Sequence, residues 1–440
     1  MKKKRSRIVI ISLGCSKNLI DSERLAARLA KGGLDVSFDA SEADGADTVV
    51  VNTCGFIGDA KEESVNTLLE VIELKNRGRV RAVYVMGCLG QRYRDDLATE
   101  MPELDGVLGK FDWECLTEAL TDHSTGARPW ERVLSTGPHY TYVKISEGCD
   151  RFCAFCAIPL ITGRHHSRPA DDILSEVADL AGKGTKEFNV IAQDLSSYGK
   201  DLAGPATGGL SPLASLIDRM ADIPGVERIR LHYAYPADFP LDVLDVMRRR
   251  PNVCRYLDIA LQHIDNGVLA NMRRHIDADG TRRLLAEIRR RVPGIHIRTT
   301  MMTGFPGEDD TAFERLLDFV REQRFERLGA FAYCEEEDTY AARNFDDSIP
   351  EEVKKERLDR LMALQQDIAF EIAESKVGSV LDVIIDEETD EFYIGRTEFD
   401  SPEVDTVVMI DKDQALEIGN IYPVKITGTC DFDLTGHIEQ

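Results

Sequence analysis

The chain has 440 residues, of which 43% are hydrophobic, so two or three domains with substantial cores are expected. Its 78 acidic and 54 basic residues give a formal net charge of −24, which argues against tight binding to nucleic-acid phosphates and favours a basic partner. No apolar run approaches the roughly 18 residues of a membrane span, and ten cysteines in so long a chain indicate metal binding or catalysis in the cytoplasm rather than a disulfide framework.

Residues 1–125 are predicted to form an open parallel α/β domain. Helical spacing of apolar residues predicts helices at 18–31 and 62–75, and short runs of Val and Ile predict strands at 7–12, 35–38, 48–52 and 82–86. The basic start before these runs resembles a lipoprotein signal that ends at Cys15. A signal core needs about 7–15 apolar residues, and residues 8–11 supply only four, so we predict a buried strand there.

A cysteine follows three of these predicted strands, at Cys15, Cys54 and Cys88. Because open parallel sheets bind ligands at the carboxyl ends of their strands, we expect the three thiols to converge at one edge. A single such cysteine would be read as a small buried residue, which is common for free cysteine. Three in the same relative position predict a metal site, whereas Cys115, Cys254, Cys334 and Cys430 lack this regularity and are read as core or incidental.

Residues 126–139 are rich in Gly and Pro and are predicted to be a linker. Residues 140–349 then alternate strands with helices, and the strands are predicted at 140–145, 187–191, 228–232, 256–261, 295–302 and 328–333. Helical crossovers between successive strands imply a parallel sheet with the helices outside. Six such units are too few to close an eightfold barrel, so a partial (β/α)6 barrel is expected.

Three cysteines lie within eight residues just after the first of these strands, at Cys149, Cys153 and Cys156. Three thiolates can hold three irons of a [4Fe–4S] cluster and leave the fourth iron open. A zinc knuckle would need a fourth ligand, for which His165 and His166 are candidates, but the chain has no second Cys-x-x-Cys pair. A disulfide would leave one thiol over, so an iron–sulfur cluster is the preferred interpretation.

Other chemically useful residues also follow predicted barrel strands. In barrel folds the chemistry gathers at the carboxyl ends of the strands, and glycine there allows the backbone to approach a ligand closely. A simple turn would explain the glycines equally well. The candidates for cofactor contact are Phe155, Gln193, Asp194, Gly304 and Gly307.

Residues 350–373 are predicted to be an amphipathic connector helix that packs against the core, with a coiled-coil partner as the alternative. Residues 374–440 shift to short strands at 381–385, 392–395, 406–410 and 421–426, which predicts a small antiparallel β-barrel. This region carries 17 acidic and 4 basic residues. A phosphate backbone would therefore be repelled, and a basic protein segment would be attracted.

Several of these segments resemble known families. Residues 149–156 (CDRFCAFC) resemble the radical S-adenosylmethionine (SAM) signature, with Phe155 at its aromatic position. Residues 12–18 with 21–23, residues 52–57 and residues 87–89 resemble the three cysteine segments of the methylthiotransferases, and residues 261–274 and 304–308 look like further motifs of that family. The terminal barrel resembles its TRAM domain, so the resemblance covers essentially the whole chain.

The methylthiotransferase resemblance implies two [4Fe–4S] clusters and SAM as cofactors. Cys149, Cys153 and Cys156 would hold the catalytic cluster, whose open iron chelates SAM and generates a 5′-deoxyadenosyl radical. The other triad, at Cys15, Cys54 and Cys88, would hold a second cluster whose open iron takes the sulfur or methylthio group. Both clusters must then face one cavity, because the radical and the sulfur act on the same carbon.

The family divides by substrate, and three features favour the branch that modifies the β-carbon of an aspartate in small-subunit ribosomal protein twelve: two motifs that resemble that branch, and a barrel whose acidic charge suits a basic ribosomal protein. These are residues 13–18, residues 393–397 with 401–405, and the acidic barrel. We therefore expect this protein as partner on the ribosome, with separate sulfur and electron donors and without direct nucleic-acid or membrane binding. The alternatives are a tRNA adenosine methylthiotransferase and a metal-bound adaptor for basic ribosomal proteins.

Overall fold

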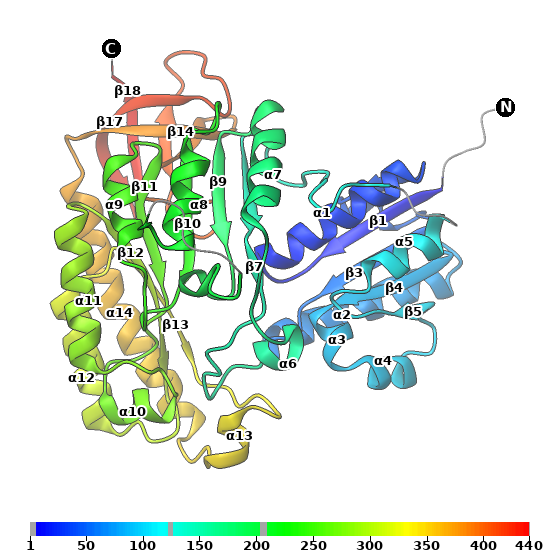
Figure 1. The fold of residues 1–440 in the computed structure, drawn as a ribbon, viewed down its shortest axis with the longest axis horizontal. Coiled ribbons are helices and arrows are strands. Elements are labelled where there is room, and N and C mark those ends of the chain that lie inside the picture. Colours follow the sequence, from blue (N-terminus) through cyan, green and yellow to red (C-terminus); the bar gives the residue numbers. More distant parts are fainter. Residues whose placement is uncertain (1–5, 122–125, 203–208, 440) are drawn as a thin grey trace.

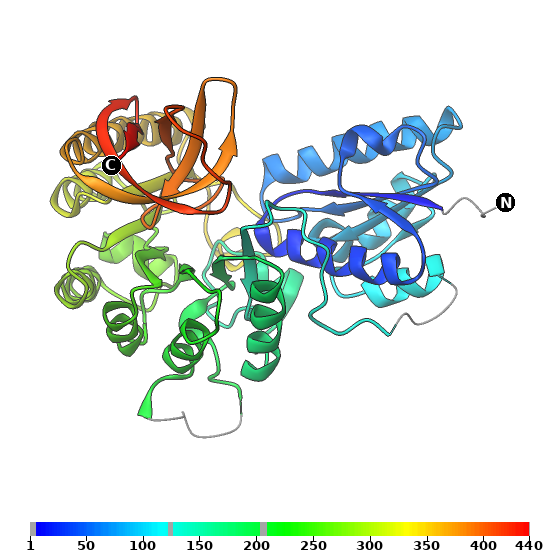
Figure 2. The ribbon, with the colours of Figure 1, turned by 90° about the horizontal axis from the view of Figure 1, so that it is seen from above.

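The computed structural model describes residues 6–121, 126–202 and 209–439, and it contains two parallel sheets and one closed barrel (Figures 1 and 2). Within these described ranges, no helix is both long enough and apolar enough to cross a membrane. Residues 1–5, which carry most of the basic start of the signal-like segment, lie outside the described residues. The apolar residues after them form a buried strand, as predicted.

The N-terminal unit is a sheet of five parallel strands in the order β2-β1-β3-β4-β5. Its strands are β1 (Arg7–Ser12), β2 (Asp35–Ser37), β3 (Thr48–Thr53), β4 (Ala82–Gly87) and β5 (Gly106–Val107). Its helices are α1 (Ser16–Lys31), η1 (Ala40–Ala43), α2 (Gly58–Asn76), α3 (Cys88–Arg92), α4 (Arg94–Glu100) and α5 (Trp113–Thr121). Every residue of β3 is buried, as a central parallel strand covered on both faces requires. The four predicted strands are confirmed; β5, only two residues long, was not predicted.

The central unit is an open barrel of six parallel strands in the order β13-β12-β11-β10-β9-β6. The strands are β6 (Tyr140–Lys144), β9 (Glu187–Ile191), β10 (Arg228–Ala234), β11 (Val253–Ile259), β12 (His296–Thr303) and β13 (Arg327–Ala332). The crossover helices line its outer side (Figure 2) and are α7 (Ala170–Gly182), α8 (Pro212–Ala221), α9 (Asp242–Arg249), α11 (Ala278–Arg291) and α12 (Asp310–Gln323). The loops hold β7 (Ser146–Glu147), α6 (Ile158–Thr162), β8 (His166–Ser167), η2 (Leu195–Ser197), α10 (Asn266–Asn271) and α13 (Tyr340–Asn344). The predicted partial barrel is confirmed.

Helix α14 (Glu351–Ser375) leads from the central unit to the C-terminal barrel. Its Leu361 and Ile368 join the main hydrophobic core, so the predicted packing against this chain's own core is confirmed. The barrel closes in the order β14-β15-β16-β18-β17. Its strands are β14 (Val380–Glu388), β15 (Phe392–Thr397), β16 (Val408–Asp411), β17 (Ile421–Cys430) and β18 (Asp433–Ile438).

The barrel differs from the expected one in two details. Strand β18 was not predicted, because its apolar residues are few and alternate with Thr, Gly and His. The pairs β14·β15, β15·β16, β14·β17 and β17·β18 are antiparallel as expected, but β16 and β18 pair in parallel. The parallel pair arises because the chain crosses the barrel to form β17 before it returns beside β16.

The segment between the first two units is anchored rather than loose. The side chain of Arg132 is fully buried and forms ion pairs with Glu23 of α1 at 3.0 Å and Glu176 of α7 at 2.9 Å. The backbone and hydroxyl of Ser135 donate to the other oxygen of Glu23 at 2.8 and 3.0 Å. The predicted linker therefore joins helices of two domains through buried charge pairs.

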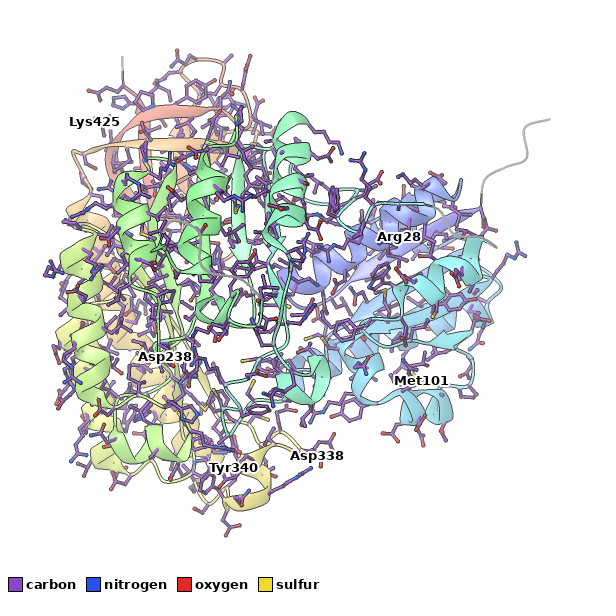
Figure 3. All side chains as sticks on the ribbon, in the orientation of Figure 1. Arg28, Met101, Asp238, Asp338, Tyr340 and Lys425 are labelled. Carbon is purple, nitrogen blue, oxygen red and sulfur yellow. The ribbon has the colours of Figure 1, made fainter. Side chains whose placement is uncertain are left out.

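The C-terminal barrel docks at the amino ends of β9 and β10 through buried charges. Arg228 donates to the carbonyls of Arg396 and Asp382 at 3.0 and 2.8 Å, and Glu187 accepts from Arg396 at 3.0 Å and Arg230 at 3.2 Å. Figure 3 places Lys425 of the barrel at one end of the molecule and Tyr340, near the cysteine loops, at the other. The carboxyl ends of the central strands are thus left free for chemistry.

Glu187 stabilises this docking in its ionised form. Burial raises the pKa of its carboxyl, but Arg396 and Arg230 outweigh that effect and hold the pKa at about 2. A carboxyl with a depressed folded-state pKa contributes stability above its ordinary pKa and loses it as the pH falls toward the folded value.

We expect Glu187→Gln to lower the free energy of unfolding at pH 7 by about 3–5 kcal/mol, because it leaves buried guanidinium groups unpaired. Urea unfolding followed by circular dichroism measures this, and the gap between wild type and variant should narrow between pH 5 and pH 2. The control is Glu227→Gln, whose partly exposed pair with Lys186 at 3.4 Å should contribute less than about 1 kcal/mol. Equal effects of the two substitutions would contradict this account.

Candidate functional site: two cysteine triads at the domain junction

The three N-terminal cysteine loops touch one another. Cys15, Cys54 and Cys88 follow β1, β3 and β4, which are neighbouring strands in the sheet. A Cβ added to Gly14 would lie 2.8 Å from the Cβ of Cys54, and one added to Gly55 would lie 2.9 Å from the backbone of Cys88. The parallel topology therefore brings the three segments together, and only glycine fits at these two contacts.

Asn18, in the first turn of α1, ties these loops to each other. Its buried side-chain amide donates to the carbonyls of Leu13 at 3.2 Å and Thr53 at 3.0 Å. Its side-chain oxygen accepts from the Cys88 thiol at 3.6 Å, and Asn52 donates to its backbone carbonyl at 2.8 Å. Asn18 lies within a recognised sequence motif (residues 12–18), but its contacts with Thr53 and Cys88 could not be predicted from the sequence.

Two lysines give the N-terminal triad a positive surrounding. Although Cys15 is exposed in part, the protein packed around its thiol raises the pKa, and the charges of Lys17 and Lys110 outweigh this and leave the pKa below its ordinary value. Burial raises the pKa of Cys54 and takes that of Cys88 to about 11. Metal ligation requires thiolates, so the nearby cations favour the ligating form of Cys15.

The second triad lies in a loop that is fixed on both sides. The backbone of Ala154 accepts from Ala341 at 2.7 Å and donates to Met272 at 3.0 Å. A Cβ at Gly148 would lie 2.0 Å from the carbonyl of Arg164, so glycine is required at the entrance to the loop. Phe152 adopts a positive φ of 47°, which is rare for a residue other than glycine and is typical of functional loops.

Arg274 and Tyr235 surround the Cys153 sulfur. The guanidinium of Arg274 donates to Cys153 Sγ at 3.2 Å, and the Tyr235 hydroxyl lies 3.9 Å from the same sulfur. The Tyr235 ring lies 4.2 Å from the guanidinium of Arg274 and 4.2 Å from that of Arg151. Burial raises the pKa of Cys156 and takes that of Cys149 to about 12, so these two thiols also need a metal to become thiolates.

Each triad offers three thiols, the number that a [4Fe–4S] cluster takes from the protein when one iron stays open. Within the described part of the chain, no three or more His, Cys, Asp or Glu side chains are arranged around one ion position. In a [4Fe–4S] cluster each cysteine binds a different iron, whereas zinc draws its ligands to one point at about 2.3 Å. His165 instead contacts Ser167 at 3.0 Å, and both His165 and His166 face Asp201, so the alternative of a zinc knuckle is disfavoured.

The two triads lie beside each other where the domains meet. Cys88 packs against Ala157, the residue after Cys156, and against Ile161 of α6. Lys144 at the end of β6 pairs with Asp21 of α1 at 2.5 Å and with Glu147. These contacts place both triads on the side of the central unit where its strands end, as a shared cavity requires.

Among the residues predicted to contact a cofactor, Gln193 and Asp194 lie beside the second triad. Asp194 accepts from Arg151 of the cysteine loop at 2.7 Å and caps η2 through its other oxygen. Gln193 donates to Glu147 at 3.1 Å, while its buried side-chain oxygen has no hydrogen-bond partner among the described residues. Gln193 is therefore the better placed of the two to accept a bond from a ligand.

The other predicted residues have contacts within the protein. Gly304 (φ 73°) and Gly307 (φ 95°) both have left-handed backbones; a Cβ would lie 2.3 Å from Lys354 Cγ in the first case and 2.6 Å from the Asn271 amide in the second. Phe155 packs edge-on against Phe305 at 6.2 Å. Packing explains why glycine is needed at both positions, and cofactor contact by these residues stays a prediction.

Comparisons with known proteins agree with the three structural units. Residues 7–109 match the family described as Uncharacterized protein family UPF0004, residues 143–320 match the Radical SAM superfamily, and residues 377–438 match the TRAM domain.

Curated relatives match along the whole chain. The ribosomal protein uS12 methylthiotransferase RimO of Porphyromonas gingivalis is 54% identical over 99% of both chains. The protein of the same name from Bacteroides fragilis is 54% identical over 99% of this chain and 100% of that one. The protein of that name from Cytophaga hutchinsonii is 45% identical over 99% of this chain and 98% of its own.

The fold of this chain is also similar to the folds of solved structures. The radical S-adenosylmethionine methyltransferase TsrM from Kitasatospora setae, with cobalamin and a [4Fe–4S] cluster bound, superposes with a TM-score of 0.57. The match covers 77% of both chains at 15% identity, which is evidence for a shared fold alone.

We expect Asn18→Ala to lower the free energy of unfolding of the N-terminal unit by about 2–3 kcal/mol, because it leaves buried carbonyls without donors. Amide hydrogen exchange should accelerate in the three cysteine loops. The control is Asn344→Ala, which removes one exposed bond to the Tyr340 carbonyl at 2.8 Å and should leave exchange unchanged. Unaltered exchange at residues 13–18 and 53–55 in the Asn18 variant would refute the role assigned here.

Proposed function

Because this chain belongs to the family of ribosomal protein uS12 methylthiotransferases, we propose that it adds a methylthio group to the β-carbon of an aspartate in uS12, the small-subunit ribosomal protein twelve. The observation that carries this proposal is 45–54% identity to proteins of that name over nearly the whole of both chains. The chain is a radical SAM methylthiotransferase, and the tRNA-modifying alternative has no support among these relatives.

The cofactors are two [4Fe–4S] clusters and SAM. When bound, they supply the carbon-centred radical, the methyl group and a binding place for the sulfur that a separate source provides. We propose that Cys149, Cys153 and Cys156 hold the cluster that binds SAM. Cys15, Cys54 and Cys88 would hold the second cluster. The contact of Cys88 with Ala157 supports a short path between the two.

The remaining tasks fall to this chain's own side chains. We propose that Arg274 stabilises the thiolate of Cys153, to which it donates at 3.2 Å. Gln193, with its unpartnered buried oxygen, would accept a hydrogen bond from the cofactor or the substrate. The buried pair of Asp21 with Lys144 would hold the two domains in contact while the site is in use, and Lys110 pairs with the same carboxylate from within the first domain.

uS12 is the substrate, and the proposal also covers where the enzyme meets uS12 and which donors it needs. We propose that the enzyme works in the cytoplasm on uS12 within the ribosome, with a separate electron donor and sulfur source. The net charge of −13 in residues 374–440 supports docking on a basic protein rather than on nucleic acid. The proposed domains are residues 1–125, 140–349 and 374–440, joined by the linker 126–139 and the connector helix 350–373.

Anaerobic incubation of the reduced enzyme with SAM and a sulfur source, with small ribosomal subunits or with tRNA, tests the function. We expect mass spectrometry to locate one methylthio group on an aspartate of uS12, together with release of 5′-deoxyadenosine. A methylthio group on a tRNA adenosine would contradict the proposal. Failure to release 5′-deoxyadenosine would instead favour an adaptor without chemistry.

Replacing each cysteine triad by alanine separates the two proposed clusters. We expect either triple variant to lose about half of the iron, because each removes all three protein ligands of one cluster. The variant without Cys15, Cys54 and Cys88 should still cleave SAM but should not modify uS12, whereas the variant without the other triad should do neither. Cys430→Ala, on the exposed C-terminal barrel, serves as the control with full iron. Zinc in place of iron, or full iron in either triple variant, would contradict the assignment.

A further inference from the structure

The segment that links β15 to β16 places a row of carboxylates against the central barrel. Glu398 pairs with Arg255 at 2.7 Å, Asp400 pairs with Arg327 at 2.5 Å, and Asp405 pairs with Arg298 at 3.6 Å. The acidic charge of this segment is thus largely neutralised by arginines of the same chain. It serves docking of the C-terminal barrel and is not free for a partner.

Glu403, in the same segment, is the exception. Among the described residues, no Lys, Arg or His side chain lies within ion-pair distance of its carboxylate. The hydroxyls of Tyr140 and Tyr142 instead donate to its two oxygens at 3.0 and 3.3 Å. Burial, followed by the charge of Glu403, raises the pKa of both tyrosines, so they are neutral donors. Glu403 is therefore a negative charge held in a fixed position without a cation.

The backbone conformation of Glu403 also indicates that the surrounding structure holds this residue in place. Glu403 is exposed and adopts a φ of 70°, in the left-handed region that residues other than glycine seldom occupy. Such conformations persist where the surrounding structure holds them, and they gather at ligand-binding sites. The two tyrosine hydrogen bonds provide that restraint here.

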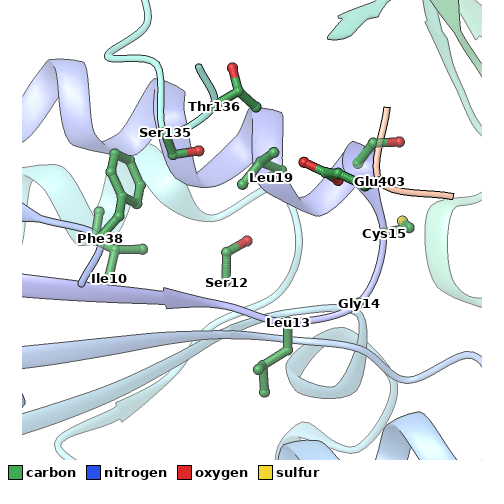
Figure 4. A pocket seen from close by; sticks show the side chains of 11 residues that line it. Ile10, Ser12, Leu13, Gly14, Cys15, Leu19, Phe38, Ser135, Thr136 and Glu403 are labelled. Carbon is green, nitrogen blue, oxygen red and sulfur yellow. The ribbon is translucent and has the colours of Figure 1, made fainter. Parts of the chain in front are cut away.

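Glu403 faces a cavity of about 320 Å³ that involves three parts of the chain (Figure 4). This volume is within the usual range of about 300–1,000 Å³ for ligand pockets. Glu403 and Cys15 lie at one end of the cavity, and Phe38 and Ser135 lie at the other. Between them, the lining combines apolar side chains with small hydroxyl groups, at Ile10, Leu13, Leu19, Ser12, Ser16 and Thr136.

We propose that this cavity, the Glu403 pocket, binds a lysine or arginine side chain of uS12 that lies within a few residues of the target aspartate. A long basic side chain places its aliphatic stem along apolar walls and its charged head at a carboxylate. The carboxylate of Glu403 disfavours an anionic group such as a phosphate beside it, because among the described residues no Lys, Arg or His forms an ion pair with it. Lys17 and Lys110, whose charges act on the neighbouring Cys15, leave Glu403 unpaired. This inference rests on the proposed function. It adds to the general attraction between the acidic barrel and a basic protein one specific pocket for one basic side chain.

The position of Cys15 gives the pocket a role in alignment. Cys15 lines the same cavity, and it belongs to the triad proposed to hold the sulfur-bearing cluster. A basic residue fixed by Glu403 would therefore hold the neighbouring stretch of uS12 against that cluster. Glu403 would act as a specificity-determining residue that contacts the substrate but takes no part in bond breaking.

Glu403→Gln tests the proposal, because glutamine keeps an oxygen for the tyrosines and removes the charge. Steady-state methylthiolation of small ribosomal subunits should show KM raised about tenfold, with kcat within twofold of wild type. The rate of 5′-deoxyadenosine release without substrate, the iron content and the circular dichroism spectrum should not change. The matched control is Glu439→Gln, an exposed barrel position in a different cavity with Lys425 and His437, which should leave KM unchanged.

A double-mutant cycle identifies the partner residue. Subunits are reconstituted with uS12 variants in which each Lys or Arg near the modified aspartate is replaced, one at a time, by glutamine. We expect one such variant to raise KM about tenfold with wild-type enzyme, and Glu403→Gln to have no further effect on that variant.

The possible failures of this experiment are distinguishable. If Glu403→Gln and Glu439→Gln change KM equally, or if the effects of Glu403→Gln add to those of every uS12 variant, the pocket does not bind a basic side chain. If wild-type enzyme fails to modify uS12 while it does release 5′-deoxyadenosine, the proposed function is overturned, and this inference falls with it.

Discussion

The contact of Cys88 with Ala157 and Ile161 is the constraint on which the rest of the structure depends. A reaction that generates a radical at one cluster and delivers sulfur from another needs both within reach of the same carbon atom. Neither domain can satisfy this alone, because each carries one triad at the carboxyl ends of its own parallel strands. The buried charges at the domain junction, Asp21 with Lys110 and Lys144, accompany that contact.

Ion pairs are used differently at the two ends of the central barrel. At the amino ends, Glu187 and the arginines around it attach the C-terminal barrel to the central barrel through buried ion pairs. At the carboxyl ends, Arg274 and Arg151 both stack on Tyr235 beside the cysteine loop, and Arg274 donates to the Cys153 sulfur while Arg151 pairs with Asp194. Arginine thus stabilises domain docking at one end of the barrel and stabilises a cysteine sulfur at the other.

The sequence was sufficient to predict most of the architecture, because continuous apolar runs mark buried parallel strands and cysteine spacing marks the ligands. Strands β5 and β18 escaped prediction because one is too short and the other too polar to show a pattern. The roles of Asn18, Tyr235 and Glu403 were not predicted for another reason, although Asn18 and Glu403 lie within recognised sequence motifs. Their importance comes from partners far away in sequence, such as Cys88, Arg151 and Tyr140, and no local pattern reports such contacts.

Arg132 has a consequence for how a large substrate reaches the centre of this molecule. Its guanidinium is sealed between Glu23 and Glu176, so the covalent bridge from the first domain to the second is clamped to helices on both sides. If the domains moved apart, the buried charges of Arg132, Glu23 and Glu176 would become exposed to water. We therefore expect the first and second domains to keep their relative position when a large substrate binds.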